Sequence, residues 1–332
     1  MQNVFRTSSP SSRLFAAVML FYSIVFQLSA QNVSCSVANK VYVAPGQQGQ
    51  ARVLLNNWEK RREVKRVSYT LTIGGSTGEE HVLELEKPLT YNDAATLTVD
   101  VPPAARPGVD EFMVTIVRVD GEPNRNSFPM SSSKRYTLTR PVWRKAVVED
   151  LTGMWCPNCP PGIASLEHLN RVAADRYIGL AAHDGDALGT GDYYEVFRFF
   201  PGRPKIVLNG SHNVPPYFGN SGTDEQPFGL LTDVQQASGA QSAVQLLVQA
   251  AWSADRKSVD VRSATVYRCP VAKNKYRLAY VLTADSLKHP SFVQNNIESG
   301  DPIWEKSVPE MQIFYHGTGE MRGLCYNDVV LS

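Results

Sequence analysis

The sequence predicts three folded parts, an α/β domain set between two β-sandwiches. Apolar and polar residues alternate near both ends of the chain, which is typical of half-buried strands. Between these regions, strand-like and helix-like runs take turns, as in α/β domains. The length of 332 residues also exceeds that of one ordinary domain. The predicted boundaries are 33–140 for the first sandwich, 141–240 for the α/β domain and 241–332 for the second.

Charge excludes one class of partner. Lys and Arg total 33 and Asp and Glu total 32, so the formal net charge is +1. A chain this balanced lacks the electrostatic footprint of a nucleic-acid-binding protein. The densest basic stretch, 60–66, contains Glu63 and follows Glu59, which is typical of a solvated strand edge.

The first thirty residues have the pattern of a signal peptide. Arg6 and Arg13 supply positive charge, an apolar core follows over 14–28, and Ala30 provides a small residue for cleavage. An uncleaved signal anchor is the alternative. We therefore expect the protein to be exported from the cytosol.

Export changes how the five cysteines are interpreted, because disulfides persist outside the cytosol. Cys269 and Cys325 lie in the same third of the chain, and the sequence leaves open whether they pair. Cys35 ends the run Asn-Val-Ser-Cys, a poor lipoprotein signal because it lacks a bulky aliphatic residue three positions before the cysteine. Lipidation at Cys35 is thus left open as the lesser alternative.

Strands are expected throughout 33–140. Residues 67–73 and 95–101 alternate apolar with polar side chains, and turn signals such as Gly74-Gly75 separate the runs. Further strand-like runs occupy 52–55, 81–85, 112–119 and 135–139. Six or seven short strands in about a hundred residues are typical of an Ig-like β-sandwich.

After residue 141, the pattern changes from successive strands to alternating strands and helices. The predicted order is strand, helix, strand, helix, strand, over 144–149, 160–174, 177–182, 192–200 and 205–209, and a helical stretch at 227–237 closes the unit.

Strand character returns in the C-terminal third. Strands are predicted at 244–252, 276–282, 311–314 and 324–331, and they make up the second sandwich. This sandwich has few strands, so the sequence leaves open whether the chain ends inside it.

The most informative motif is Trp155-Cys156-Pro157-Asn158-Cys159-Pro160, which joins a predicted strand to a predicted helix. The N–H groups and dipole of a helix N-terminus stabilise a thiolate there. One sulfur of such a pair can attack a foreign disulfide while the other resolves it. A purely structural disulfide is the alternative. A zinc site is disfavoured because no second ligand pair exists, and covalent haem because Pro160 occupies the position of the required histidine.

The run 147–160 resembles a thioredoxin-like segment of Gram-negative proteins related to the 28-kDa outer membrane protein family, which carry a Glu-Glu-Phe-Thr-Gly-x-Trp-Cys-x-x-Cys-Pro pattern. The run 202–210 is similar to the thioredoxin stretch in which a cis-proline precedes a strand. The resemblance covers about 141–240. It implies a thioredoxin-like α/β domain, and it leaves the activity open, because the type member of the family is regarded as an adhesin or antigen.

The resemblance assigns roles to four residues. It makes Cys156 the nucleophile, Cys159 the resolving thiol, Asp150 the buried carboxylate that assists proton transfer, and Pro204 the cis-proline bordering the substrate groove. This sequence departs from the pattern of thioredoxins in two places. Pro160 replaces a lysine that often follows the second cysteine, which raises the expected pKa of Cys156. Asn158 replaces a common proline.

Three further features have competing interpretations. His183 ends a predicted strand and is either a proton shuttle or a hydrogen-bonded loop histidine. The loop 184–195 fits most of a calcium-loop pattern, but Leu188 stands where an oxygen ligand belongs, and Asp192 as a helix N-cap is the plainer interpretation. Aromatic residues between 193 and 200 fit a packed helix or, less directly, a partner-binding groove beside Pro204.

The sequence therefore predicts thiol–disulfide exchange on periplasmic or cell-envelope proteins through Cys156 and Cys159. The expected partners are protein thiols and disulfides and an envelope redox partner, with outer-membrane association left open. No organic cofactor or metal is required. The alternative is a non-enzymatic outer-membrane or surface binding protein, an adhesin or antigen, in which the cysteine pair is a structural disulfide.

Overall fold

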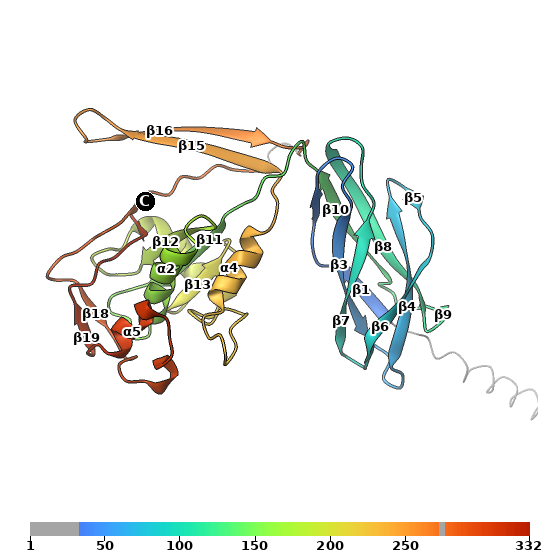
Figure 1. The fold of residues 1–332 in the computed structure, drawn as a ribbon, viewed down its shortest axis with the longest axis horizontal. Coiled ribbons are helices and arrows are strands. Elements are labelled where there is room, and N and C mark those ends of the chain that lie inside the picture. The colour runs from blue at the N-terminus through green and yellow to red at the C-terminus, as the bar shows by residue number, and fades with distance from the viewer. Residues whose placement is uncertain (1–32, 272–275) are drawn as a thin grey trace, which may run out of the picture. The chain divides into compact units, whose positions relative to one another are not determined.

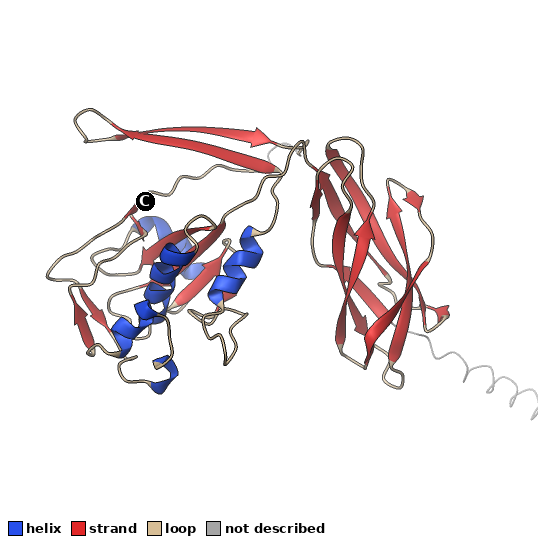
Figure 2. Ribbon diagram, in the orientation of Figure 1, coloured by secondary structure: helices blue, strands red, loops and turns tan. Residues whose placement is uncertain are grey.

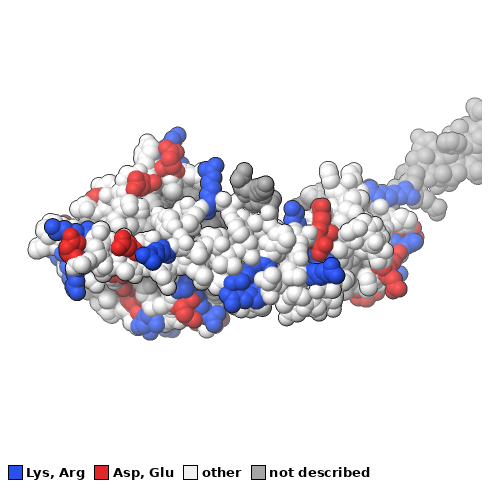
Figure 3. Space-filling view, turned by 90° about the horizontal axis from the view of Figure 1, so that it is seen from above, with Lys and Arg blue, Asp and Glu red and all other residues white. Residues whose placement is uncertain are grey.

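A computed structural model describes residues 33–271 and 276–332 and divides into two compact units at Thr139 and Arg140. The predicted signal segment lies outside the described residues. Within the described residues, no helix is both long and apolar enough to cross a membrane. On the face drawn in Figure 3, Lys and Arg side chains are interspersed with Asp and Glu.

The N-terminal unit is built from two sheets (Figure 1). One sheet has the antiparallel order β1 (Val33–Val37), β3 (Gly49–Asn57), β7 (Ala94–Val101). The other has the order β2 (Val41–Val43), β10 (Met130–Thr137), β8 (Gly108–Val119), β4 (Val64–Ile73), β5 (Ser76–Thr77), with β6 (His81–Leu89) beside β4 and β9 (Glu122–Pro123) beside β8. Only the β2–β10 pair in this unit's described strands is parallel.

Alternation along the strands buries one face of each sheet in this unit. In β3, Ala51, Val53 and Leu55 are buried while the residues between them are exposed or half-buried. They pack in one cluster with Phe112 from the other sheet. Cys35 also lies in this core, where its Sγ donates to the Pro129 carbonyl oxygen at 3.2 Å. The thiol considered for lipidation is thus a packed interior side chain of β1.

The C-terminal unit is organised around one mixed six-stranded sheet. Its strand order is β14 (His212–Val214), β13 (Lys205–Leu208), β11 (Ala146–Thr152), β12 (Tyr177–His183), β20 (Val329–Val330), β17 (Thr283–Ala284). β11, β12 and β20 run parallel, whereas β13, β14 and β17 are antiparallel to their neighbours. Asp150 of β11 lies between Ala181 of β12 and Ile206 of β13, at the centre of the sheet.

Helices cover both faces of this sheet (Figure 2). α2 (Pro160–Val172) and α4 (Leu230–Ser238) pack on one face against Val148. η1 (Gly191–Tyr193) and α3 (Tyr194–Phe199) pack on the other against Leu151. Farther along the chain, η2 (Pro302–Trp304) and α5 (Pro309–Tyr315) contribute Trp304, Met311 and Phe314 to a further cluster that includes Ala164 of α2.

The predicted fold class, a thioredoxin-like α/β domain between two sandwiches, is wrong. Of the residues that the structure describes, 41% lie in strands, spread over several sheets, against 14% in helices, and no thioredoxin-like α/β core is indicated among them. The region expected to form the second sandwich contributes β17 and β20 to the mixed sheet and otherwise forms two small hairpins, β15 (Val244–Trp252) with β16 (Val259–Tyr267) and β18 (Val293–Asn295) with β19 (Glu320–Arg322).

A physical reason is visible in the exposure of β15. Leu246 is 54% exposed and Trp252 is 67% exposed, so no second sheet covers the alternating apolar face that the sequence pattern predicted correctly. A sandwich needs two such faces packed together, and within the described residues β15 and β16 form a two-stranded sheet of their own.

Two predicted C-terminal strands are also wrong. The stretch 311–314 belongs to helix α5, in which Pro309 occupies the first turn and the buried Met311 and Phe314 lie three residues apart on one face. The stretch 276–282 is in no sheet, although its apolar residues alternate. Of 324–331, only Val329–Val330 forms a strand.

Candidate functional site

The two cysteines of the Cys-x-x-Cys motif form a disulfide where the chain passes from β11 into α2. Their Cα atoms are 5.4 Å apart, and Cys159 is the N-cap residue of α2. The Cys156 amide donates to the Gly153 carbonyl oxygen at 3.0 Å, which closes a tight turn before the helix. Cys35, Cys269 and Cys325 are free thiols in this structure.

The first turn of α2 contains fewer amide donors than the motif suggested. Pro160 and Pro161 occupy its first two positions and have no N–H. The next amides, of Gly162 and Ile163, both point to the Cys159 carbonyl oxygen, at 3.0 and 3.4 Å. The expectation that free N–H groups at the helix start stabilise a Cys156 thiolate is therefore weakened, and mainly the helix dipole remains.

Asp150 is buried directly beneath this turn. It is 0% exposed, and neither carboxylate oxygen has a hydrogen-bond partner. Burial raises the pKa of the Asp150 carboxyl to about 8, although the charge of Arg203 acts in the opposite direction. The carboxyl therefore exchanges its proton near neutral pH.

Gly162 makes room for the Asp150 carboxyl. A Cβ atom at position 162 would lie 2.5 Å from Oδ1 and 2.7 Å from Oδ2 of Asp150, well inside van der Waals contact. The helix thus approaches the carboxyl at the residue whose amide bonds to Cys159, and any larger side chain would separate them.

Pro204 is the residue after a cis peptide bond at Arg203 and immediately precedes β13. Its neighbour Arg203 forms an ion pair with Asp184, Nη2 to Oδ2 at 2.9 Å, and its guanidinium stacks 4.3 Å from the Phe197 ring centroid. These contacts fix the loop that carries Pro204, which itself is half-buried.

Trp155, beside the disulfide, is 50% exposed. Its Nε1 donates to the Asp184 carbonyl oxygen at 2.6 Å, and its ring lies over Gly153. Through Asp184, the Trp155 side chain and the Arg203 loop are joined.

His183 and Asp186 form a buried pair next to this loop. Nδ1 of His183 lies 2.8 Å from Oδ2 of Asp186, and the Asp186 carboxylate also accepts from the Met154 and Leu188 amides. Burial alone would raise the pKa of Asp186, but these hydrogen bonds and the His183 charge outweigh it and hold the pKa below its usual value. His183 therefore reaches the cysteine turn through Asp186 and Met154.

Two of the four carboxylates in the loop 184–195 take part in these contacts. Asp184 bonds to Arg203 and Asp186 to His183. The prediction of Asp192 as a helix N-cap is wrong, because Thr190 caps η1 by accepting from the Asp192 amide.

Within the described residues, no group of three His, Cys, Asp or Glu side chains could hold a metal ion. A cavity of about 290 Å³ lies against this loop, lined by His183, Asp184, Asp186, Thr190, Tyr194 and Phe197 among others.

A segment of the C-terminal region, Val293–Ile297, covers the disulfide. Cys156 is 2% exposed and Cys159 is 0% exposed. Gln294, itself fully buried, donates from Nε2 to the Cys156 carbonyl oxygen at 2.9 Å. Sequence reasoning missed this contact, because residues 138 positions apart share no local pattern. We call Val293–Ile297 the strap.

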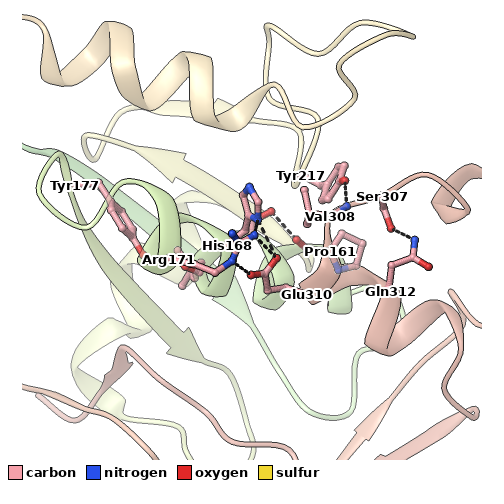
Figure 4. A network of polar contacts seen from close by, with 11 residues as sticks. Pro161, His168, Arg171, Tyr177, Tyr217, Ser307, Val308, Glu310 and Gln312 are labelled. Atoms are coloured by element: carbon pink, nitrogen blue, oxygen red, sulfur yellow. Dashed lines mark hydrogen bonds and ion pairs between the residues drawn. The ribbon is translucent and has the colours of Figure 1, made fainter.

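Helix α5 docks the C-terminal region onto α2 through Glu310 (Figure 4). Its carboxylate lies 2.6 Å from Nε of Arg171 and 2.8 Å from Nδ1 of His168. Burial would raise the pKa of Glu310, but these partners outweigh it and lower the pKa to about 2. Figure 4 also shows Tyr217, whose hydroxyl accepts from the Val308 amide just before α5.

Comparisons with known proteins assign no activity to the chain. No protein-family model and no curated protein matches it. A CARDB domain from Pyrococcus furiosus, solved in complex with di-metal ions, is similar over 33% of this chain and 96% of its own, with 12% identity and a TM-score of 0.26. Red sea bream transglutaminase is similar over 34% of this chain and 16% of its own, with 16% identity and a TM-score of 0.25. A β-glucosidase from Listeria innocua is similar over 32% of this chain and 17% of its own, with 10% identity and a TM-score of 0.22.

Proposed function

We propose that the protein performs thiol–disulfide exchange with polypeptide substrates through Cys156 and Cys159. The observation that carries this proposal is the Asp150 carboxyl, buried without a partner beneath the turn that bears the disulfide. A structural disulfide needs no ionisable group behind it, and burying one without a partner costs several kcal/mol. Such groups are concentrated at functional sites.

The chemistry follows from the two sulfurs and this carboxyl. In the reduced protein, the Cys156 thiolate attacks a substrate disulfide, forms a mixed disulfide and releases one substrate thiol. Asp150 accepts the proton of the Cys159 thiol, whose thiolate then attacks Cys156. The mixed disulfide breaks, the Cys156–Cys159 bond forms, and the substrate leaves with two thiols. Two electrons pass from the pair to the substrate, and the reverse sequence oxidises a substrate dithiol.

A pKa of about 8 suits this role for Asp150, because a proton carrier works best near the operating pH. Export to the periplasm or outer membrane stays a prediction from the N-terminal sequence and from the resemblance of 147–160. It would place the pair among substrates that hold disulfides.

A second candidate is a surface binding protein with a structural disulfide. The burial of both cysteines and the prolines at 160 and 161 favour it, because both raise the free energy of a Cys156 thiolate. A disulfide reduction potential below about −300 mV, together with a Cys156 pKa near that of free cysteine, would support this alternative.

Insulin reduction driven by an external dithiol tests the proposal. We expect wild-type protein to accelerate insulin precipitation and Cys156→Ala to be inactive. Cys325→Ser, which removes a half-buried free thiol, is the matched control and should keep wild-type activity. Equal rates for wild type and Cys156→Ala would refute exchange at this pair.

A further inference from the structure

The strap forms hydrogen bonds with every residue of the cysteine turn from 154 to 157. Four successive backbone carbonyl oxygens of the turn each accept a hydrogen bond from it, at 2.8 to 3.0 Å. The pairs are Asn295 N to Met154 O, Asn295 Nδ2 to Trp155 O, Gln294 Nε2 to Cys156 O, and Ile297 N to Pro157 O.

The strap is extended chain, and residues Val293–Asn295 form strand β18. One side of β18 pairs with β19 of the same C-terminal region, and the other side meets the cysteine turn. Extended peptides are recognised in this way, with main-chain hydrogen bonds supplying affinity and alternate side chains supplying specificity. The strap therefore displays the kind of ligand that this face of the turn accepts.

The strap is anchored independently of the disulfide. Asn296 points away from the turn, and its Nδ2 donates to the Phe314 and Thr318 carbonyl oxygens at 2.8 and 3.0 Å. The side chains of Gln294 and Asn295 can therefore leave the turn without loss of these anchors.

One side chain of the strap, Gln294, has an unsatisfied polar atom. It is fully buried, yet its Oε1 has no hydrogen-bond partner. An unsatisfied buried amide oxygen is unfavourable, so the closed state is less stable than the full set of contacts suggests. The strap is thus bound to the turn but poised to be displaced.

We propose that the strap is an autoinhibitory segment that occupies the binding face for an extended polypeptide substrate. This inference rests on the proposed function and refines it. The substrate is a segment of extended chain whose backbone N–H groups donate to the Met154 and Pro157 carbonyls, and it must displace the strap before its sulfur reaches Cys156.

The test compares the full-length oxidised protein with Gln294→Ala/Asn295→Ala, which removes two of the four bonds and keeps the Asn296 anchors. We measure how fast two reductants reduce the Cys156–Cys159 disulfide. One is a water-soluble phosphine, which is oxidised to its phosphine oxide as water supplies the oxygen and protons. The other is reduced, unfolded ribonuclease A, a polypeptide dithiol. We expect the variant to react about 10-fold faster or more with both.

Ser299→Ala is the matched control, because Ser299 bonds only to Gly317 within the C-terminal region among its described side-chain contacts. It should react at the wild-type rate. Asn295→Ala alone, which loses only the solvent-exposed side-chain bond to the Trp155 carbonyl, should give an intermediate rate and covers the case in which the double variant does not fold.

The outcomes separate the two proposals. An unchanged phosphine rate in both variants overturns the strap inference. A faster phosphine reaction with an unchanged polypeptide rate shows that the strap covers the disulfide but does not compete with substrate, which also overturns the inference. Failure of every form to exchange with the polypeptide, while the phosphine reacts, overturns the proposed function.

In a separate measurement, hydrogen exchange is followed on Cys159→Ser carrying a cysteine peptide trapped on Cys156. We expect the Asn295 and Ile297 amides to lose protection relative to the untrapped protein. Retained protection would contradict displacement of the strap.

Discussion

The two units differ in how many of their buried polar side-chain atoms lack a hydrogen-bond partner. In the N-terminal unit, Thr137 is the only described residue with a buried side-chain oxygen or nitrogen that lacks a partner. Among the described residues, the C-terminal unit has seven. Five of them lie on the elements around the disulfide: Asp150, Thr152, Arg203, Gln294 and Tyr326. The other two, Gln241 and Arg268, flank the β15–β16 hairpin.

This contrast indicates which unit is a structural scaffold and which contains the functional site. A folded unit satisfies its buried polar groups unless something else requires them, because each unsatisfied group costs about 1–3 kcal/mol. The N-terminal sandwich is close to that rule, and even its buried thiol at Cys35 has a carbonyl partner. In the described part of the C-terminal unit, most of the exceptions to this rule gather around the disulfide, so we place the chemistry there.

The largest effect is expected at Asp150. Asp150→Asn keeps the shape of the side chain but removes its ionisation, so Cys159 loses its proton acceptor. We expect the rate of resolution of the mixed disulfide to fall about 10²-fold. Stopped-flow measurement of release from a trapped substrate checks this. Asp110→Asn in the N-terminal unit is the control, and a similar rate for both variants would break the contrast between the units.

The same substitution should change how stability depends on pH. The folded pKa of Asp150 is raised from 3.8 to about 8, so its neutral form is favoured in the folded state. Its contribution to stability is fully present below about pH 4 and is lost as pH rises through 8, with a slope of at most about 1.4 kcal/mol per pH unit.

Asp150→Asn should remove this slope. We therefore expect the free energy of unfolding of the variant to rise relative to that of the wild type as pH rises from 4 to 8, by several kcal/mol in total. Urea unfolding followed by tryptophan fluorescence measures it, because four of the five tryptophans lie in the C-terminal unit. Parallel pH profiles for the two proteins would mean that Asp150 is not buried as a neutral acid.

The sequence predicted the parts of the fold that local pattern controls. Alternation located the strands of the N-terminal unit, and the motif around Cys156 located the start of α2. The identity of α5 was missed because four residues, 311–314, fit a strand as well as a helix, although Pro309 was a usable start signal.

The rest depends on long-range contacts. The strap contacts a turn that lies about 140 residues earlier in the sequence. The short strand β20 pairs with β12, which also lies far earlier in the chain. Nothing in the spacing of Gln294 or Val329 indicates those partners. Asp150 is different, because the resemblance assigned it the buried carboxylate position, although the strand also contains Glu149 and the sequence pattern alone does not choose between them.

A smaller effect is expected at Glu310, which docks the C-terminal region onto α2. Its pKa is lowered from 4.5 to about 2, so its stabilising contribution is present above about pH 4.5 and is lost as pH falls through 2. Glu310→Gln should therefore destabilise the C-terminal unit at pH 7 by about 1–3 kcal/mol.

Urea unfolding at pH 7 measures this loss, which should vanish near pH 2. Glu195→Gln is the matched control, since Glu195 pairs with Arg198 on the surface and the change should cost under about 0.5 kcal/mol. Equal losses for the two variants would show that Glu310 is no more than a surface ion pair, and the C-terminal region would then be held by its apolar contacts.

The smallest effect concerns the helix start. Pro161→Ala restores an N–H in the first turn of α2, which can favour negative charge near Cys156. A single such interaction is worth about 0.3–1 kcal/mol, so the pKa of the reduced Cys156 thiol should fall by roughly 0.5. Thiolate absorbance or the pH dependence of alkylation measures the change. Pro107→Ala, in an exposed loop of the N-terminal unit, should leave it unaltered. A Cys156 pKa that is equally low in wild type and in Pro161→Ala would mean that the dipole alone stabilises the thiolate, and the prolines would then be no argument for a structural disulfide.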